Sequence, residues 1–268
     1  MTTESEMRTC LVTGAARGIG AATARTLARQ GWRVVINYRS SREAAELLAG
    51  SIVESGGIAM VIKADVSDRK DVARMGEELA ALGIRIDGLV HNAAAPFLRF
   101  STSREVWAPA FSDQIATSCG GFLNVMQELQ KVMSKECLVL VLLTSALTVH
   151  DGAETAAYLA GKGALLGLCR GWNRELTAKG KRLILVSPGA TKTDLLLGSA
   201  GDHPRKIELF EQALDQAGVA SPAEIAEQIA KIVAGAATLC STGSQPPHLI
   251  LDRQGIRRLE YALEYILL

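Results

Sequence analysis

The sequence has no excess of charge and no long apolar run. Its 29 basic and 28 acidic residues nearly cancel, so neither nucleic acid nor an anionic membrane is expected as a partner. The longest uninterrupted apolar run is far shorter than the roughly 18–20 residues that span a bilayer. Residues 1–8 are polar and mixed in charge, unlike a signal peptide.

Paired cysteines are also absent. The five cysteines, at positions 10, 119, 137, 169 and 240, show no C-x-x-C spacing, and three lie in or beside apolar segments. This pattern is typical of buried free thiols in a reducing compartment. We therefore expect a cytoplasmic protein without a disulfide framework and without a metal site.

The chain lacks a Pro/Ser-rich linker, an internal repeat and a block of like charge. Its 268 residues exceed the usual domain length, but doubly wound α/β folds of this size commonly form one unit. We expect residues 1–268 to form a single domain. Within it, residues 194–218 contain Gly198, Gly201 and Pro204 before a charged helix, a composition that suits a substrate lid.

The chain does contain a regular alternation of short apolar runs and helical segments. Seven runs are predicted to be strands: Cys10–Val12, Trp32–Asn37, Ile58–Lys63, Ile86–Val90, Cys137–Leu143, Leu183–Val186 and His248–Leu251. The helical segments include a long one over about Arg104–Ser134 and another that runs to about Lys179. This alternation predicts a Rossmann-type α/β fold, a doubly wound parallel sheet of about seven strands with helices on both faces.

The first predicted strand leads directly into a glycine-rich turn and then a helix. Residues 13–20 have the sequence TGAARGIG. Gly14 would permit the tight turn, Gly18 would let the backbone approach a pyrophosphate, and Gly20 would let helix and strand pack closely. Backbone N–H groups at such a helix start attract phosphate. The alternative is a tight turn that binds nothing.

Tyr158 and Lys162 are four residues apart in a predicted helix, so their side chains share one face. A free phenol has a pKa of about 10, and a fixed positive charge favours the phenolate. We therefore expect Lys162 to lower the pKa of Tyr158 toward the range of acid–base catalysis. Ser145, which comes from a separate strand, would hold a substrate oxygen beside the phenol. A half-buried tyrosine with a solvated lysine neighbour is the alternative.

The end of the second predicted strand indicates which dinucleotide would bind. Sites for NAD usually carry an acidic residue there, whereas this chain has the neutral Asn37. Tyr38, Arg39 and Ser40 follow it, and Arg17 in the glycine turn adds a second guanidinium. Two cations without a carboxylate suit a 2′-phosphate, because arginine binds phosphate through paired hydrogen bonds. NADP(H) is therefore predicted; two surface arginines without a ligand are the alternative.

Further short motifs occur in a fixed order along the chain. They are an acidic residue after the third strand (Asp65), an N-A-A turn (Asn92–Ala94), the Ser145, Tyr158 and Lys162 set, and a P-G turn at Pro188 followed by Thr193. With the glycine turn, this order resembles the short-chain dehydrogenase/reductase family, over about residues 9–255. Within it, the chain is most similar to 3-oxoacyl-[acyl-carrier-protein] reductases.

The resemblance implies a set of site residues. Ser145, Tyr158 and Lys162 would be catalytic, with Ser118 in place of an asparagine that helps to hold a proton-relay water in relatives. The predicted cofactor contacts are Gly14, Arg17, Gly18, Ile19, Gly20, Asn37, Tyr38, Arg39, Ser40, Asp65, Val66, Asn92, Ala93, Lys162, Pro188, Gly189 and Thr193.

The resemblance also implies an activity: NADPH-dependent reduction of a carbonyl to an alcohol, with Tyr158 as proton donor. The substrate would be a small-molecule or carrier-bound ketone such as a β-ketoacyl thioester, and the protein would be a homo-oligomer, a dimer or tetramer. Two alternatives stay open. One is a catalytically weak NADP-binding regulator; the other is a structural subunit that pairs with an active homologue through the apolar residues 261–268.

Overall fold

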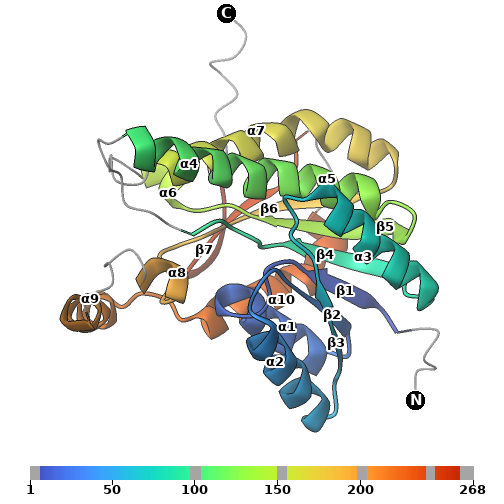
Figure 1. The fold of residues 1–268 in the computed structure, drawn as a ribbon, viewed down its shortest axis with the longest axis horizontal. Helices are drawn as coiled ribbons and strands as arrows, with labels where there is room; N and C mark the ends of the chain where they lie inside the picture. Colours follow the sequence, from blue (N-terminus) through green and yellow to red (C-terminus); the bar gives the residue numbers. More distant parts are fainter. Residues whose placement is uncertain (1–6, 97–103, 150–155, 198–203, 240–244, 260–268) are drawn as a thin grey trace, which may run out of the picture.

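The computed structural model describes residues 7–96, 104–149, 156–197, 204–239 and 245–259, and in this part of the chain eight strands form one sheet (Figure 1). The strands are β1 (Thr9–Val12), β2 (Arg33–Tyr38), β3 (Ile58–Lys63), β4 (Ile86–His91), β5 (Met133–Leu142), β6 (Arg182–Pro188), β7 (His248–Asp252) and β8 (Gly255–Arg258). Their order across the sheet is β3-β2-β1-β4-β5-β6-β7-β8. The order reverses between β1 and β4, which is where doubly wound sheets bind ligands.

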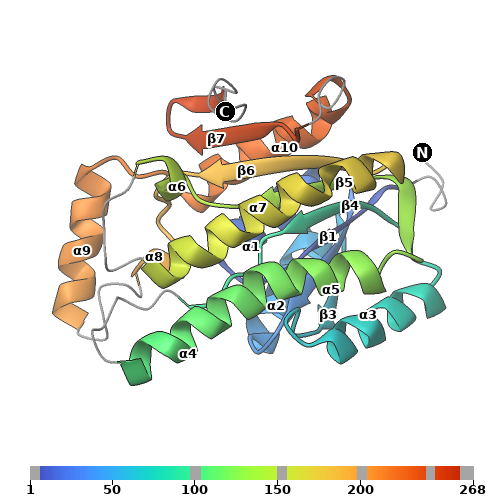
Figure 2. The same ribbon diagram turned by 90° about the horizontal axis from the view of Figure 1, so that it is seen from above.

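Helices cover both faces of the sheet (Figure 1). One face carries α1 (Gly18–Arg29), α2 (Arg42–Glu54) and α10 (Pro222–Leu239), and the other carries α3 (Arg69–Ala81), α4 (Arg104–Ile115), α5 (Gly121–Glu128) and α7 (Ala156–Ala178). The short α6 (Ala146–Val149) and α8 (Asp194–Leu197) follow β5 and β6, and α9 (Pro204–Gln216) follows α8. In Figure 2, α4 and α5 lie nearly in line and α7 runs beside them.

The two faces of the sheet form two separate hydrophobic cores. Along β1, Cys10 and Val12 belong to the core under α1, α2 and α10, whereas Leu11 belongs to the core under α3, α5 and α7. Successive side chains of a strand point to opposite faces, so a strand covered on both sides must be apolar throughout. This is why the strands appear in the sequence as continuous apolar runs.

The structure confirms the fold class but corrects the predicted strand count. The eighth strand, β8, pairs antiparallel with β7 through a tight turn in which the Gln254 backbone N–H donates to the Asp252 carboxylate. Gly255 closes this turn with a φ of 120°, which favours glycine. The strand GIRR is short, largely polar and partly exposed, so it has none of the apolar pattern that predicts a strand.

The predicted long helix over about Arg104–Ser134 is also wrong in its extent. A π-helical turn, η2 (Ala116–Gly120), separates α4 from α5, and α5 ends at Glu128. The strand β5 then begins at Met133, not at Cys137, because Met133 pairs with Ile86 of β4 before the register shifts. Backbone pairing thus extends β5 across polar residues that carry no strand pattern.

In the part of the chain that the structure describes, no helix is long and apolar enough to cross a membrane. The segment 261–268, named above for a structural subunit, lies outside the described residues, as do residues 198–203 of the expected lid. Single-domain organisation and a lid over 194–218 stay predictions.

Candidate active site

Two adjoining cavities lie at the carboxyl ends of the parallel strands. The first cavity has a volume of ≈ 200 Å³ and is lined by the loops after β1, β2, β3, β4 and β6 and by Thr117 of η2. The second has a volume of ≈ 390 Å³ and is lined by the loops after β4, β5 and β6 and by α7. They share the walls Ile19, Asn92, Ala94, Thr193 and Leu195. One elongated ligand could therefore occupy both.

The glycine turn is pressed against the end of β4. A Cβ on Gly14 would lie 2.9 Å from the Cα of Ala93, and a Cβ on Gly20 would lie 2.5 Å from Asn92 Nδ2. Gly14 also has a φ of 60°, which other residues adopt only with strain. Asn92 Nδ2 donates to the carbonyl oxygens of Thr13 (2.9 Å) and Gly14 (3.0 Å). The turn therefore needs glycine at both positions.

Helix α1 begins at Gly18, directly after this turn. The residue before it, Arg17, has an extended backbone, and no side chain caps the helix start among the residues described. The first N–H groups of such a helix are free to bind an anion. Thr193 lies across the turn, with its Cγ2 3.5 Å from the position of a Cβ on Gly18. This geometry fits a phosphate group between α1 and Thr193.

Asn37 connects two loops that line the first cavity. It is 1% exposed, its Oδ1 accepts from the Gly14 backbone N–H (3.2 Å), and its Nδ2 donates to the carbonyl of Ala64 (3.0 Å). Its amide thus joins the glycine turn to the end of β3. Asn37 lines the cavity as predicted, but its side chain is already bonded to the protein on both sides.

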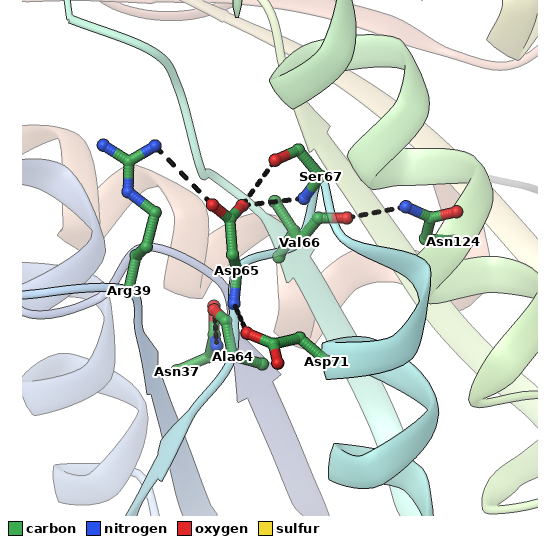
Figure 3. A network of polar contacts seen from close by, with 8 residues as sticks. All are labelled: Asn37, Arg39, Ala64, Asp65, Val66, Ser67, Asp71 and Asn124. Carbon is green, nitrogen blue, oxygen red and sulfur yellow. Dashed lines mark hydrogen bonds and ion pairs between the residues drawn. The ribbon is translucent and has the colours of Figure 1, made fainter.

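The loop after β3 holds a fixed carboxylate at the edge of the first cavity (Figure 3). The Asp65 carboxylate accepts from the Ser67 backbone N–H (2.9 Å) and from Ser67 Oγ (2.6 Å). The backbone N–H of Asp65 donates to Asp71 of α3, and Asn124 of α5 donates to the carbonyl of Val66. Hydrogen bonds to two helices therefore fix Asp65 and Val66.

Both predicted guanidinium groups have a carboxylate nearby, although the end of β2 itself carries none. Arg39 Nη1 lies 3.8 Å from Asp65 Oδ2 (Figure 3), and Arg17 Nη1 lies 4.0 Å from Asp194 Oδ2. Sequence reasoning missed both pairs because their acidic members come from other loops. The guanidinium groups are largely exposed and the distances long, so each pair is weak. Both arginines can therefore turn to a phosphate.

Ser145, Tyr158 and Lys162 come together in the second cavity, as their spacing predicted. Ser145 follows β5, and its backbone N–H donates to the carbonyl of Pro188 at the end of β6 (2.9 Å). Tyr158 and Lys162 lie on α7, one turn apart. The cavity therefore presents a hydroxyl, a phenol and an ammonium group together.

Burial determines the protonation of Tyr158 and Lys162. The expectation that Lys162 lowers the pKa of Tyr158 is corrected. Burial raises the pKa of Tyr158 above its usual value, against the lowering effect of a hydrogen bond with Thr144. Lys162 is 3% exposed, and its Nζ donates to the carbonyl of Leu142 (2.8 Å) and lies 5.9 Å from the centre of the phenol ring. Burial lowers the pKa of Lys162 to about 8. The phenol is thus protonated at neutral pH.

Ser118 is the predicted catalytic residue that lines neither cavity. It is fully buried on η2, and within the described part of the chain its Oγ has no hydrogen-bond partner. The carbonyl of Ser118 lies 3.2 Å from Nε2 of His91, the last residue of β4. Sequence reasoning missed His91, although a histidine in the otherwise apolar end of a strand is a signal. It also missed Thr144, the neighbour of Ser145.

The described cysteines, Cys10, Cys119, Cys137 and Cys169, are free thiols. Among the residues that the structure covers, no group of three or more His, Cys, Asp or Glu side chains is placed to hold a metal ion.

The fold and the two cavities define a Rossmann-type α/β protein with a glycine turn at the point where the strand order reverses. Residues 14–245 match a family model described as enoyl-(acyl carrier protein) reductase. The chain belongs to the short-chain dehydrogenase/reductase family, which confirms the resemblance found in the sequence.

Known relatives resemble the chain over most of its length. The 3-oxoacyl-[acyl-carrier-protein] reductase FabG of Staphylococcus aureus is 30% identical over 210 residues, which cover 78% of this chain and 82% of that protein. The uncharacterized oxidoreductase YgfF of Escherichia coli is 28% identical over 243 residues, 89% of this chain and 97% of that protein. A short chain dehydrogenase from Burkholderia cenocepacia, solved in complex with NADP, has a TM-score of 0.71 and 26% identity, and the match covers 84% of this chain and 90% of that one.

Proposed function

We propose that this protein is an NADP(H)-dependent oxidoreductase that reduces a ketone to an alcohol, with Tyr158 as the proton donor. The observation that carries the proposal is a half-buried phenol in the second cavity, protonated at neutral pH because desolvation raises its pKa, beside a first cavity shaped for phosphate. Ser145 and Lys162 lie in the same cavity as the phenol. Family membership supports this class of reaction.

The first cavity fits NADP(H). The start of α1 and the close backbone approach at Gly14 suit the pyrophosphate, and Arg17 and Arg39 suit the 2′-phosphate. The NADP complex of the Burkholderia relative supports this choice of cofactor. When bound across both cavities, NADP(H) supplies the hydride. The remaining chemistry belongs to side chains of this chain.

Tyr158 would donate its phenolic proton to the carbonyl oxygen of the substrate as that oxygen gains charge. The Ser145 hydroxyl would hydrogen-bond the same oxygen and hold it beside the phenol. Because the pKa of Tyr158 is raised, the phenol carries its proton at neutral pH, as a proton donor in reduction must. Lys162, whose pKa is about 8, is still largely protonated at neutral pH and would stabilise the phenolate that remains.

The lining of the second cavity favours an apolar substrate. Leu142, Leu143, Leu195 and Leu196 form much of its wall, and Lys162 is the cation among its described lining residues. Such a wall suits the acyl chain or ring of a ketone, and the FabG relative supports a β-ketoacyl thioester as one member of this class. A homo-oligomer and a cytoplasmic location are part of the proposal, on family resemblance and on the free thiols.

The test is NADPH oxidation against a panel of ketones that includes β-ketoacyl thioesters on coenzyme A and on carrier protein. Tyr158→Phe removes the proton donor and leaves the first cavity intact. We expect its kcat to fall on the order of a thousandfold, within the usual range for acid–base groups, with an NADPH Kd within about threefold of wild type. Wild-type turnover by the variant would show that Tyr158 is not the proton donor.

The same panel separates the proposal from a regulatory role. If the wild-type protein binds one NADPH per chain but oxidises none with any ketone, then a cofactor-binding regulator or structural subunit is the better description.

A further inference from the structure

Thr144 lines the second cavity, and the proposed function gives its hydroxyl no role. It lies between the end of β5 and Ser145, and both of its neighbours in the chain are hydrogen-bonded to β6. The backbone N–H of Leu143 donates to the carbonyl of Val186 (2.7 Å), and that of Ser145 donates to the carbonyl of Pro188 (2.9 Å). The backbone around Thr144 is therefore fixed at the point where β5 leaves the sheet.

The side chain of Thr144 makes two hydrogen bonds. Its Oγ1 accepts from the backbone N–H of Ala146 at the start of α6 (3.3 Å). It also makes a hydrogen bond with the phenol of Tyr158 on α7, and this bond lowers the pKa of Tyr158. A hydroxyl has one hydrogen to donate and two lone pairs with which to accept. The bond from Ala146 uses a lone pair, so the hydroxyl hydrogen of Thr144 is available to the phenol oxygen.

Lys162 is the other titratable group among the described residues that line the second cavity with Tyr158. Its Nζ donates to the carbonyl of Leu142 (2.8 Å) and lies 5.9 Å from the centre of the phenol ring. The titratable groups that act on Lys162 are the thiols of Cys119 on η2 and Cys169 on α7. The ammonium group thus lies beside the ring of Tyr158 and is bound to the backbone of β5.

We propose that Thr144 is a further catalytic residue, whose hydroxyl donates a hydrogen bond to the phenolate oxygen that Tyr158 carries after it has given up its proton. The inference rests on the proposed function. In each reduction the carbonyl carbon gains the hydride and the carbonyl oxygen gains the proton. The O–H bond of Tyr158 breaks as the O–H bond of the alcohol forms, and the bonds of Thr144 itself do not change.

The contribution of Thr144 would grow as the reaction proceeds. A phenolate oxygen only accepts hydrogen bonds, so Thr144 must be the donor once Tyr158 has lost its proton. Hydrogen bonds to a charged oxygen are stronger than those to a neutral one, so this bond strengthens as charge develops on the phenol. An interaction that is stronger in the transition state than in the ground state raises kcat. The adjacent hydroxyls of Ser145 and Thr144 would thus serve the substrate oxygen and the phenol oxygen.

Thr144→Val, which has the same shape but no hydroxyl, and Thr144→Ser, which keeps the hydroxyl, test this role. The first measurement is a ¹⁹F NMR titration of cofactor-free protein in which fluorotyrosine replaces the four tyrosines, because its more acidic phenol titrates nearer neutral pH. Tyr158→Phe identifies the signal. We expect the midpoint to rise by about one pH unit in T144V, because the phenolate loses a donor, and to stay at the wild-type value in T144S. An unchanged or lower midpoint in T144V overturns the inference, as does a T144S protein that titrates like T144V.

The second measurement is the reduction of a ketone that the wild type accepts. For T144V we expect kcat to fall about tenfold and the NADPH Kd to stay within about threefold of wild type. The alkaline limb of the kcat profile should move to higher pH, because a phenol with a higher pKa keeps its proton to higher pH. We expect T144S to keep kcat within about threefold of wild type.

The Tyr158→Phe background separates this role from a structural one. No phenolate forms there, so we expect T144V to lower kcat by less than a further twofold or so. If Thr144 only held α6 and Ser145 in place, T144V would lower kcat about as much in this background as in the wild type, and that result overturns the inference.

If T144V does not fold, Thr144→Ala replaces it in both measurements, with the same criteria. A wild type that reduces no ketone would contradict the proposed function instead. The fluorine titration needs no substrate and then decides the inference alone: an unchanged midpoint without the Thr144 hydroxyl overturns it.

Discussion

The first cavity takes its shape from hydrogen bonds and backbone geometry, whereas the second is defined by burial. Around the first, Asn37 and Asn92 each make at least two hydrogen bonds to neighbouring loops, and the Asp65 carboxylate accepts two from Ser67 in its own loop. Around the second, Tyr158 and Lys162 lie among leucines, and burial changes the pKa of both. In the proposed function, the ordered polar groups of the first cavity would prepare cofactor binding, and the exclusion of water from the second would prepare the chemistry.

The two designs have opposite effects on stability. Hydrogen bonds in the first cavity stabilise the folded chain and the bound cofactor together. A buried ammonium group in the second disfavours the folded state, which is a common relation between activity and stability. The comparison predicts that substitutions in the first cavity weaken binding, and that some in the second remove activity while they stabilise the protein.

Lys162→Met is expected to have the largest effect, with kcat lowered on the order of a thousandfold. In the cofactor-free protein we expect the free energy of unfolding at pH 7 to rise by about 1–3 kcal/mol. The fall in the pKa of Lys162 from 10.5 to about 8 disfavours folding, and loss of the bond to the Leu142 carbonyl offsets part of the gain.

The pH dependence of this gain follows from the direction of the shift. The pKa of Lys162 is lower in the folded state than in the unfolded state. The buried ammonium group therefore destabilises the folded wild type fully below about pH 8, and this destabilisation disappears as the pH rises to 10.5. Urea denaturation of both proteins at pH 7 and near pH 10 measures the difference. A Lys162→Met protein that is no more stable than wild type at pH 7 would contradict the account.

The second-largest effect is expected from acid. Burial lowers the pKa of His91 to about 3 and that of His248 to about 4, from 6.5. The stability that these neutral rings contribute is complete above pH 6.5. It is lost as the pH falls from 6.5 toward the folded-state pKa values of about 4 and about 3. We expect the free energy of unfolding to fall by about 1.4 kcal/mol per histidine for each pH unit below 6.5. Denaturation at pH 7 and pH 5 measures this, and equal stability at both would show that the rings are not buried.

Arg39→Ala is expected to weaken NADPH binding by about ten- to a hundredfold and NADH binding by less than about threefold, because a charge-assisted contact to the 2′-phosphate is lost. Arg42→Ala is the matched control. It removes a neighbouring cation that is paired with Glu46 and does not line the first cavity. Equal losses for NADPH and NADH in Arg39→Ala would contradict the assignment of the 2′-phosphate site.

The smallest effect is expected from Ser67→Ala. It removes the 2.6 Å hydrogen bond from Ser67 Oγ to Asp65 but leaves the backbone N–H bond in place. We expect the NADPH Kd to rise by about two- to threefold, with kcat unchanged at saturating NADPH. Fluorescence titration beside steady-state kinetics measures both. A change in kcat larger than the change in Kd would show that the two cavities are not separate in function.

The sequence predicted the first cavity better because backbone geometry sets its key contacts. Gly14 and Gly20 are required by the turn itself, and a turn of this kind has a recognisable residue pattern. The α/β fold could be predicted as well, because the alternation of apolar strands and helical segments along the sequence also reflects backbone geometry. The acidic partners of Arg17 and Arg39 could not be predicted, since Asp194 and Asp65 reach them from distant parts of the chain.

For the second cavity, spacing predicted which residues meet but not their protonation. Four residues on a helix bring Tyr158 and Lys162 to one face, but how deeply α7 packs on β5 decides that Lys162 binds the carbonyl of Leu142. The π-helical turn at Ser118 was also beyond prediction, because tertiary contacts with His91 and Gly161 hold it in place.

The central claim is that binding and chemistry reside in different cavities, and two variants measured side by side test it most directly. We determine the NADPH Kd and the kcat at saturating NADPH for Tyr158→Phe and Arg39→Ala. For Tyr158→Phe, the account predicts that kcat falls on the order of a thousandfold while the NADPH Kd stays within about threefold of wild type. For Arg39→Ala, it predicts that the NADPH Kd rises about ten- to a hundredfold while kcat stays within about threefold of wild type. Losses of binding and turnover in equal proportion in both variants would contradict it.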